Sequence, residues 1–199
     1  MAGNPHSIII RHHERFTPLG IVMAQEMVWM DLEMTGLDIE VESIIEIATV
    51  ITDADLNIIA TGPNLAIKVN QELIDGMDEW NTKHHHSSGL IDRINSEGVT
   101  LDEAVKQTCE FLEKHIENGK APLCGNSIHN DRVFLAKEMP QVLELLHYRI
   151  VDVTSVKEIA KRWYPDLPRY QKKESHRALD DILESIEELR YYRKTIFND

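Results

Sequence analysis

The sequence predicts an α/β domain with a mixed five-stranded sheet that is flanked by helices. Three segments rich in β-branched residues follow one another across short connections, which favours an antiparallel meander. Two later strands are each followed by a segment of helical periodicity, as in strand–helix units. A meander joined to two such units gives a mixed sheet with helices against it.

The three meander strands come first in the chain. We predict the first strand over Met27–Met34 and the second over Ser43–Thr52, where β-branched residues dominate. The turn-like segment Asp53–Asn57 leads to a third strand over Ile58–Val69, which Gly62-Pro63 is expected to interrupt.

The first strand–helix unit follows a long helix. That helix opens at Thr100 with the capping-box pattern Thr-Leu-Asp-Glu. Its apolar stripe consists of Ala104, Val105, Cys109, Leu112 and Ile116. A short strand is predicted over Ala121–Cys124, a turn at Gly125-Asn126, and a helix over Ile128–Glu138 that stops near Pro140.

The second strand–helix unit is predicted to have its strand at Ile150–Val153 and its helix from Thr154 to about Trp163. The polar loop Pro168–Ser175 then leads to the last helix. Apolar residues recur there at helical spacing, namely Leu179, Ile182, Leu183, Ile186 and Leu189.

The composition indicates an ordinary globular protein, with 42% apolar and 28% charged residues, and no apolar run approaches the roughly 18 residues of a membrane span. The net charge of −13, with 34 acidic against 21 basic residues, opposes a general grip on long nucleic acids. A nuclease of this charge needs cations among its carboxylates and favours short substrates. The two cysteines fit a reducing compartment, so we expect a cytoplasmic protein.

Residues 1–26 differ from the rest because basic residues and histidines mix there with proline and glycine. We expect a disordered extension, or an over-long start with translation beginning at Met23 or Met27. A transit peptide is the alternative, since acidic residues are scarce, but the segment lacks a clear amphipathic period.

Two carboxylates are the first sign of chemistry. Asp31 and Glu33 are two residues apart on the first strand, so both point to the same face. Their neighbours are almost all apolar, and two acids on a buried face repel each other unless a cation lies between them. An edge strand with a wet face is the alternative.

Further acids lie near predicted helix starts. Asp131 follows the strand–turn Leu123–Asn126, while Asp180 and Asp181 lie in the opening turns of the last helix, after His176. Each of these acids is also compatible with the ordinary preference for acids in a first helical turn. Taken together, hard oxygen ligands suit Mg²⁺ or Mn²⁺, two of which can stabilise an in-line phosphoryl displacement, and a histidine can accept a proton from water.

The segments DLEMTGL, GNSI…D, HYR…DVTS and HRALDDI together resemble the DEDD exonuclease superfamily, in the subgroup that uses histidine. Within it, the resemblance to the oligoribonuclease family extends from Met27 to Phe197. It implies a ribonuclease-H-like fold over residues 27–199 and a homodimer. It also implies 3′→5′ hydrolysis of short oligoribonucleotides, dinucleotides especially, to nucleoside 5′-monophosphates with two divalent cations, Mg²⁺ or Mn²⁺.

The resemblance also assigns roles to the acids and the histidine. Asp31, Glu33, Asp131 and Asp181 are the implied metal ligands, and His176 is the implied general base. On one regular helix Asp180 would lie closer in angle to His176 than Asp181 does. The family spacing selects Asp181, which is consistent with a His176 that lies in the loop before the helix.

Contacts to the substrate are implied for seven further residues. Leu37 resembles a residue that wedges against a base, and Trp80 and His85 resemble a pair that lines the nucleotide site. A 5′-phosphate cap is implied for Ser127, Arg149 and Thr154, with a threonine where the family more often has serine. Tyr148 resembles a tyrosine that reaches the active site of the neighbouring subunit.

Other conspicuous residues have simpler interpretations. Of the three consecutive histidines from His84 to His86, we expect one to serve the site and the others to be solvated, because consecutive positions do not share a helix face. We expect Cys124 to be a small core residue. A DNA exonuclease with the same acids and a non-catalytic nucleotide-binding module remain the competing hypotheses; the second predicts a missing acid or base, and none is missing.

Overall fold

The computed structural model describes residues 26–171 and 177–197. The prediction for the N-terminal extension therefore lies outside the described residues, except for Glu26. The five strands are β1 (Met27–Met34), β2 (Ile44–Thr52), β3 (Ile58–Ala66), β4 (Pro122–Gly125) and β5 (His147–Asp152). The predicted mixed five-stranded sheet is confirmed, in the spatial order β3-β2-β1-β4-β5.

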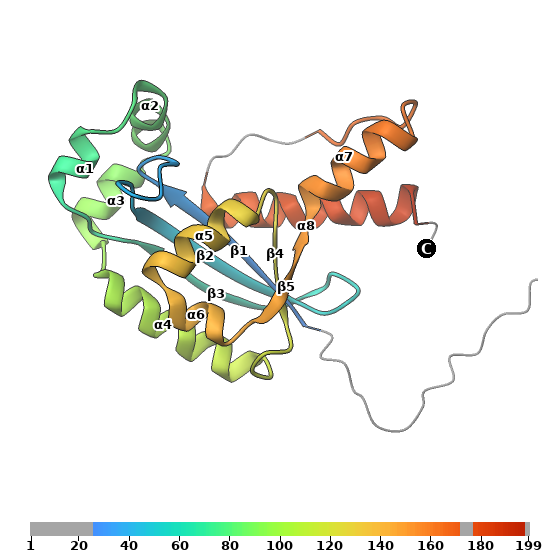
Figure 1. The fold of residues 1–199 in the computed structure, drawn as a ribbon, viewed down its shortest axis with the longest axis horizontal. Helices are drawn as coiled ribbons and strands as arrows, with labels where there is room; N and C mark the ends of the chain where they lie inside the picture. The colour runs from blue at the N-terminus through green and yellow to red at the C-terminus, as the bar shows by residue number, and fades with distance from the viewer. Residues whose placement is uncertain (1–25, 172–176, 198–199) are drawn as a thin grey trace, which may run out of the picture.

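The direction of each strand follows from its connection. Strands β1, β2 and β3 pair antiparallel across short loops, whereas β4 and β5 run parallel to β1. Figure 1 shows β1 between β2 of the meander and β4 of the first strand–helix unit. The strand with the two acids is thus central and is not the edge strand of the alternative interpretation.

The expected interruption of the third strand is wrong, because β3 continues through Gly62 and Pro63. The pairing with β2 shifts its register between Ala48 and Val50, opposite this dipeptide. Proline is tolerated here because β3 is an edge strand, so one missing N–H leaves no neighbouring strand unpaired.

Helices cover both faces of the sheet (Figure 1). Three of them, α4 (Leu101–His115), α5 (His129–Glu138) and α6 (Pro140–Glu144), pack with Val28, Met30 and Leu32 in the larger core. On the opposite face, α7 (Val153–Trp163) and α8 (Ala178–Thr195) pack around Trp29 and Cys124. Alternate residues of β1 therefore belong to different cores, and the odd-numbered ones face α8.

Several predicted helix features are confirmed. Thr100 caps α4, accepting a hydrogen bond from the amide of Glu103. Cys124 is fully buried in the core, as expected. In α8 the stripe is narrower than predicted, since Ile182 and Ile186 are buried but Leu183 is exposed.

Three short helices that were not predicted lie between β3 and α4: α1 (Gln71–Asp75), α2 (Glu79–Ser87) and α3 (Leu90–Glu97). Residues of α1 and α3 pack on a third, smaller core with Ile45 and Ala66. Helix α2 begins at Asp78, whose side chain accepts a hydrogen bond from the amide of Asn81. This region extends the sheet face beside the C-terminal end of β1 (Figure 1).

Candidate active site

Three carboxylates from the two ends of the chain meet on the α8 face of the sheet. Asp31 and Glu33 project from β1, and Asp181 lies in the first turn of α8. One ligand oxygen from each residue lies within 4.8 Å of the others. Asp180, one residue earlier, is exposed. The structure thus brings Asp181 to the other two acids, although the regular-helix geometry alone favoured Asp180.

Asp131 adds a fourth carboxylate from α5. It is 7% exposed, and its Oδ1 accepts a hydrogen bond of 2.9 Å from the backbone amide of Leu32, which lies between Asp31 and Glu33. This long-range contact to β1 differs from the first-turn capping role that was the simpler interpretation. It fixes Asp131 against the strand that carries the other acids.

The pKa values of these acids are raised because the carboxylates are buried close to one another. Burial, followed by the charge of Asp131 and then of Glu33, raises the pKa of Asp31 well above its usual range. Burial and the charges of Glu46 and Asp181 raise the pKa of Glu33 to about 8. Burial also raises the pKa of Asp131 to about 7, although the Leu32 amide opposes this rise.

Such an arrangement fits divalent cations. Buried carboxylates that face one another are unfavourable unless positive charge lies among them, and their oxygens are the hard donors that such ions prefer. The structure brings Asp31, Glu33 and Asp181 together, and Asp131 lies close enough to raise the pKa of Asp31. Their role as metal ligands stays a prediction. His176, the implied general base, lies outside the described residues.

A fifth carboxylate was missed by the sequence analysis. Glu46 of β2 is directly opposite Glu33 in the sheet and is fully buried. It forms an ion pair with Arg93 of α3, whose guanidinium also donates to the backbone oxygen of Asn64 at 3.1 Å. The signal in the sequence was a glutamate inside the apolar run Ile44–Thr52, but nothing local to that run pointed to Arg93.

The three consecutive histidines differ in their exposure, because consecutive positions of a helix point in different directions. His85 is buried, and its Nε2 lies 3.0 Å from the backbone oxygen of Met34 while its Nδ1 lies 3.9 Å from Glu33 Oε2. Burial lowers the pKa of His85, which favours the neutral ring. His86 is exposed, as expected, but His84 stacks on Trp80 with ring centroids 3.9 Å apart and is only half-exposed.

Two exposed apolar side chains lie on the segments next to this histidine. Leu37, in the loop after β1, is 75% exposed, and Trp80, on the first turn of α2, is 62% exposed. His85 of the same helix contacts Met34 at the end of β1, so both segments lie near the end of the strand that carries Asp31 and Glu33. The contact of Leu37 and Trp80 with a substrate stays a prediction.

The implied phosphate cap is brought together in part. Ser127, before α5, and Thr154, in the first turn of α7, have hydroxyl oxygens 3.1 Å apart. Tyr148 and Arg149 lie on the edge strand β5, both exposed, with the Arg149 guanidinium 5.4 Å from the centre of the Tyr148 ring. The tyrosine and the arginine are thus joined to each other on an open edge of the sheet.

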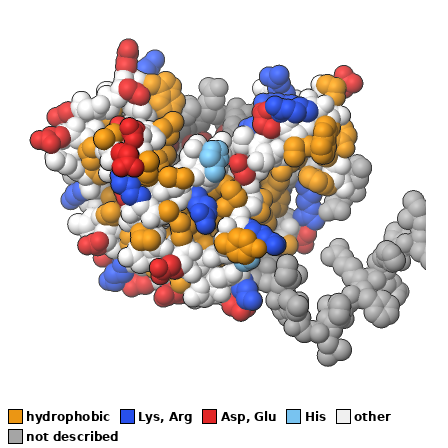
Figure 2. Space-filling view, viewed as in Figure 1, with side chains coloured by type: hydrophobic (Ala, Val, Ile, Leu, Met, Phe, Trp, Pro, Cys, Tyr) orange, Lys and Arg blue, Asp and Glu red, His pale blue; other side chains and the backbone are white. Residues whose placement is uncertain are grey.

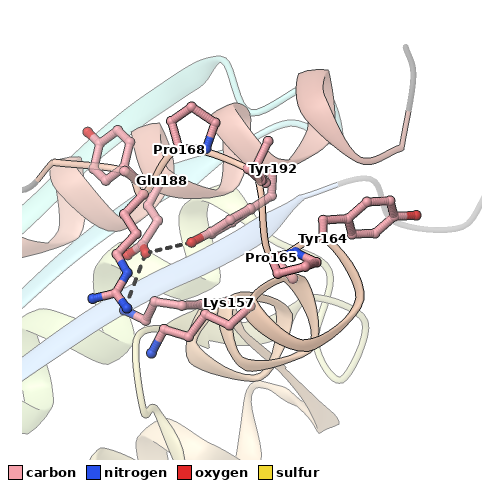
Figure 3. A pocket seen from close by; sticks show the side chains of 11 residues that line it. Lys157, Tyr164, Pro165, Pro168, Glu188 and Tyr192 are labelled. Carbon is pink, nitrogen blue, oxygen red and sulfur yellow. Dashed lines mark hydrogen bonds and ion pairs between the residues drawn. The ribbon is translucent and has the colours of Figure 1, made fainter.

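A separate cavity of about 540 Å³ lies between α7 and α8 (Figure 3). Its lining residues include Lys157, Tyr164, Glu188 and Tyr192, and none of them belongs to the acid cluster.

Among the described residues, no helix is long and apolar enough to cross a membrane.

Comparisons with known proteins agree with this geometry. The sequence profile of an exonuclease family matches residues 28–189. The chain is 52% identical over 172 residues to the oligoribonuclease of Hydrogenovibrio crunogenus, covering 86% of this chain and 94% of that protein. It is 53% identical over 180 residues to the human protein named mitochondrial oligoribonuclease, covering 89% of this chain and 76% of the relative.

Solved structures share the fold at low identity. Exonuclease I of Escherichia coli in complex with a dT13 oligonucleotide superposes with a TM-score of 0.66 at 12% identity, and exonuclease I of Methylocaldum szegediense with 0.61 at 16%. These matches cover 85% and 87% of this chain, but only 41% of each of the longer chains.

The fold, the acid cluster and the family match define an exonuclease. Membership of this family implies the use of divalent metal ions. Within that class, the chain belongs to the oligoribonuclease family.

Proposed function

We propose that this protein is a 3′→5′ exoribonuclease that hydrolyses short oligoribonucleotides, dinucleotides especially, to nucleoside 5′-monophosphates. The observation that carries the proposal is the meeting of Asp31, Glu33 and Asp181 within 4.8 Å, with Asp131 fixed beside them. The names of the relatives, at about half identity over most of the chain, supply the substrate class.

Asp31, Glu33, Asp131 and Asp181 would hold two divalent cations, Mg²⁺ or Mn²⁺. Bound there, the cations supply a polarised scissile phosphate and a more acidic attacking water. The chain supplies the rest. The Leu32 amide holds Asp131 against β1, His85 bonds through Nε2 to the backbone oxygen of Met34 at the end of β1, and His176 accepts the proton of the attacking water.

In this proposal the protein binds both ends of the substrate, the bases at one end and the 5′ phosphate at the other. Leu37 and Trp80 offer exposed apolar surface for the bases, and stacking on an aromatic ring contributes about 1–3 kcal/mol per base. At the other end, the Ser127 hydroxyl and Arg149 donate to the 5′ phosphate, and Thr154 holds Ser127 in place beside it. Ser127 and Thr154 lie where α5 and α7 begin, and helix N-termini favour anions.

A grip at both ends suits a substrate of a few nucleotides. The net charge of −13 adds repulsion of longer strands. On the face shown in Figure 2, basic side chains lie in small separate groups, without the continuous basic band that tracks a long backbone.

The proposal includes a homodimer in which Tyr148 reaches the partner's active site. Its support is the open edge of β5, with Tyr148 70% exposed, and the exposed Ile159 and Trp163 on α7, the helix that follows β5. Hydrophobic side chains also gather over α7 on the face in Figure 2. Light scattering of the wild type and of Trp163→Ala tests this; a monomeric wild type contradicts it.

We further propose that the enzyme acts in the cytoplasm, as the reduced cysteines indicate. The human relative carries the word mitochondrial in its name, so the compartment differs within the family. Imaging of the full-length chain with a C-terminal tag separates the two compartments.

The decisive experiment compares labelled ribodinucleotides with 20-mers, in the presence of Mg²⁺ or Mn²⁺ and with a chelator. Metal-dependent release of mononucleotides, fastest from the dinucleotide, is expected. No release from the dinucleotide contradicts the proposal and favours a nucleotide-binding module. Competition with deoxyribo-oligomers tests the alternative of a DNA exonuclease. Exonuclease I, whose fold is similar, was solved in complex with a DNA oligonucleotide.

A further inference from the structure

A chain of hydrogen bonds runs from the phosphate-cap hydroxyls into the interior between α7 and α8. Its centre is Asn126, which follows β4 and precedes Ser127. Asn126 Oδ1 accepts a hydrogen bond of 3.1 Å from the Thr154 hydroxyl. Its Nδ2 donates to Ser185 Oγ at 2.8 Å and to Glu188 Oε2 at 3.2 Å. One amide thus links two helices, α7 and α8, beside the proposed 5′-phosphate position.

The orientation of the Asn126 amide is fixed by its partners. The Ser185 hydroxyl donates its single hydrogen to the backbone oxygen of Asp181 at 2.8 Å, so Ser185 Oγ can only accept from Asn126. Glu188 presents a carboxylate oxygen, which as an anion also accepts. Both acceptors therefore require Nδ2 on the α8 side and Oδ1 on the side of Thr154.

The direction of the next bonds follows. Oδ1 cannot donate, so Thr154 commits its only hydroxyl hydrogen to Asn126. The oxygen of Thr154 then accepts from the backbone amide of Ser127 at 2.9 Å and from the Ser127 hydroxyl at 3.1 Å. The Ser127 hydroxyl is left as a donor that can turn toward a phosphate oxygen while the Thr154–Asn126 bond stays in place.

The inner end of the chain is firmly anchored. Glu188 is 2% exposed, and it lies 3.2 Å from Lys157 Nζ and 3.4 Å from the Tyr192 hydroxyl. Figure 3 shows these two contacts at the wall of the cavity between α7 and α8. Removing a partner of a buried charge is costly, so the position of Asn126 is held by groups far from the substrate.

The outer end depends on this anchor. Ser127 has φ of 51°, a left-handed conformation that a residue with a side chain adopts only when its surroundings hold it. Its amide is held by Thr154 Oγ1 and by Asp152 Oδ1, the latter at 2.9 Å. Loss of Asn126 would free the Thr154 hydroxyl to rotate and loosen the Ser127 backbone.

We propose that Asn126 is a positioning residue that sets the preference for substrates with a 5′ phosphate, by fixing the direction of the Ser127 and Thr154 hydroxyls. The inference rests on the proposed function, because that proposal supplies the phosphate at this position. Asn126 itself does not touch the substrate. The prediction is a specificity effect: the preference falls, while the metal cluster is left in place.

The test measures kcat and KM for one dinucleotide with a 5′ phosphate and for the same dinucleotide with a 5′ hydroxyl. The wild type is expected to prefer the phosphorylated form. In Asn126→Ala the ratio of the two kcat/KM values falls about tenfold, the size of one hydrogen bond to a charged group, and the change lies in KM. Calorimetric affinity for the phosphorylated dinucleotide, measured in chelator, falls by a similar factor. The matched control is Asn130→Ala, at an exposed asparagine on α5, which keeps the wild-type ratio.

A second variant guards against misfolding of the first. Glu188→Gln keeps the side-chain shape and removes the charge that holds Asn126, so the ratio falls in the same direction by a smaller factor. An unchanged ratio in the folded variants overturns the inference, as does a wild type that cleaves both dinucleotides equally. A wild type that cleaves neither of them contradicts the proposed function itself.

Discussion

Two groups of carboxylates differ in how their charge is balanced. Asp152 and Glu188 are surrounded by donors, including the amides of Ser127 and Thr154 for the first and Lys157 for the second. Asp31 and Glu33 lie beside other carboxylates, whose charges raise the pKa of both. Protein donors can balance a buried carboxylate, and a cation can balance carboxylates that crowd together.

Replacement of one cluster acid should give the largest effect. In Asp131→Asn the amide oxygen can still accept from Leu32, so folding is kept while a metal ligand is lost. We expect a fall in dinucleotide turnover of about a thousandfold or more, since bound metals contribute several kcal/mol to such reactions. Turnover assays with circular dichroism as the folding control measure this. Wild-type turnover in the variant would contradict the metal site.

The buried carboxylate of Glu46 is balanced by an ion pair with Arg93. Arg93→Met leaves Glu46 buried and unpaired beside Glu33, so we expect a loss of about 3–5 kcal/mol in the free energy of unfolding. Urea denaturation measures the loss. The double variant Arg93→Met, Glu46→Gln removes the charge as well and should recover much of the stability. Equal losses in both variants would show that the charge is unimportant.

The pH dependence of stability should separate the two groups further. Folding raises the pKa of Glu33 from its ordinary 4.5 to about 8, so the folded protein holds this proton more tightly. In chelator, stability is therefore highest below pH 4.5 as far as Glu33 is concerned. It falls by up to about 1.4 kcal/mol per pH unit as the pH rises toward 8.

Thermal melts at pH 5 to 8, with chelator and with saturating Mg²⁺, test this dependence. Bound cations should remove the fall, because they favour the ionised acids. Glu33→Gln in chelator should also flatten the curve. A wild-type curve that is equally steep with and without metal would argue against cation binding at these acids.

The smallest effect is expected at the neighbour of a cluster acid. Asp180→Asn changes an exposed carboxylate one residue from Asp181, and we expect turnover within about twofold of the wild type, as for ordinary surface substitutions. Asp181→Asn, assayed in parallel, should resemble Asp131→Asn. The reverse ranking would restore Asp180 as the ligand.

The sequence was most informative where a short-range period coincided with chemistry. Alternation on one strand was enough to predict that Asp31 and Glu33 share a face, and β-branched runs predicted the meander. Helix α2 was not assigned, because its segment Glu79–Ser87 has no apolar stripe; the helix depends on the Asp78 cap and on buried His85. The Glu46–Arg93 pair was beyond reach for a similar reason, since its partners belong to elements that only tertiary packing joins.

The placement of Asp181 in the final helix has a consequence for biosynthesis. The first two acids leave the ribosome early, but the site lacks one wall until α8 has been made and has docked against β1. Because domains fold as units during synthesis, an incomplete chain has no assembled set of acids. A chain in which α8 has not yet been made therefore lacks one of the three acids that meet in the cluster.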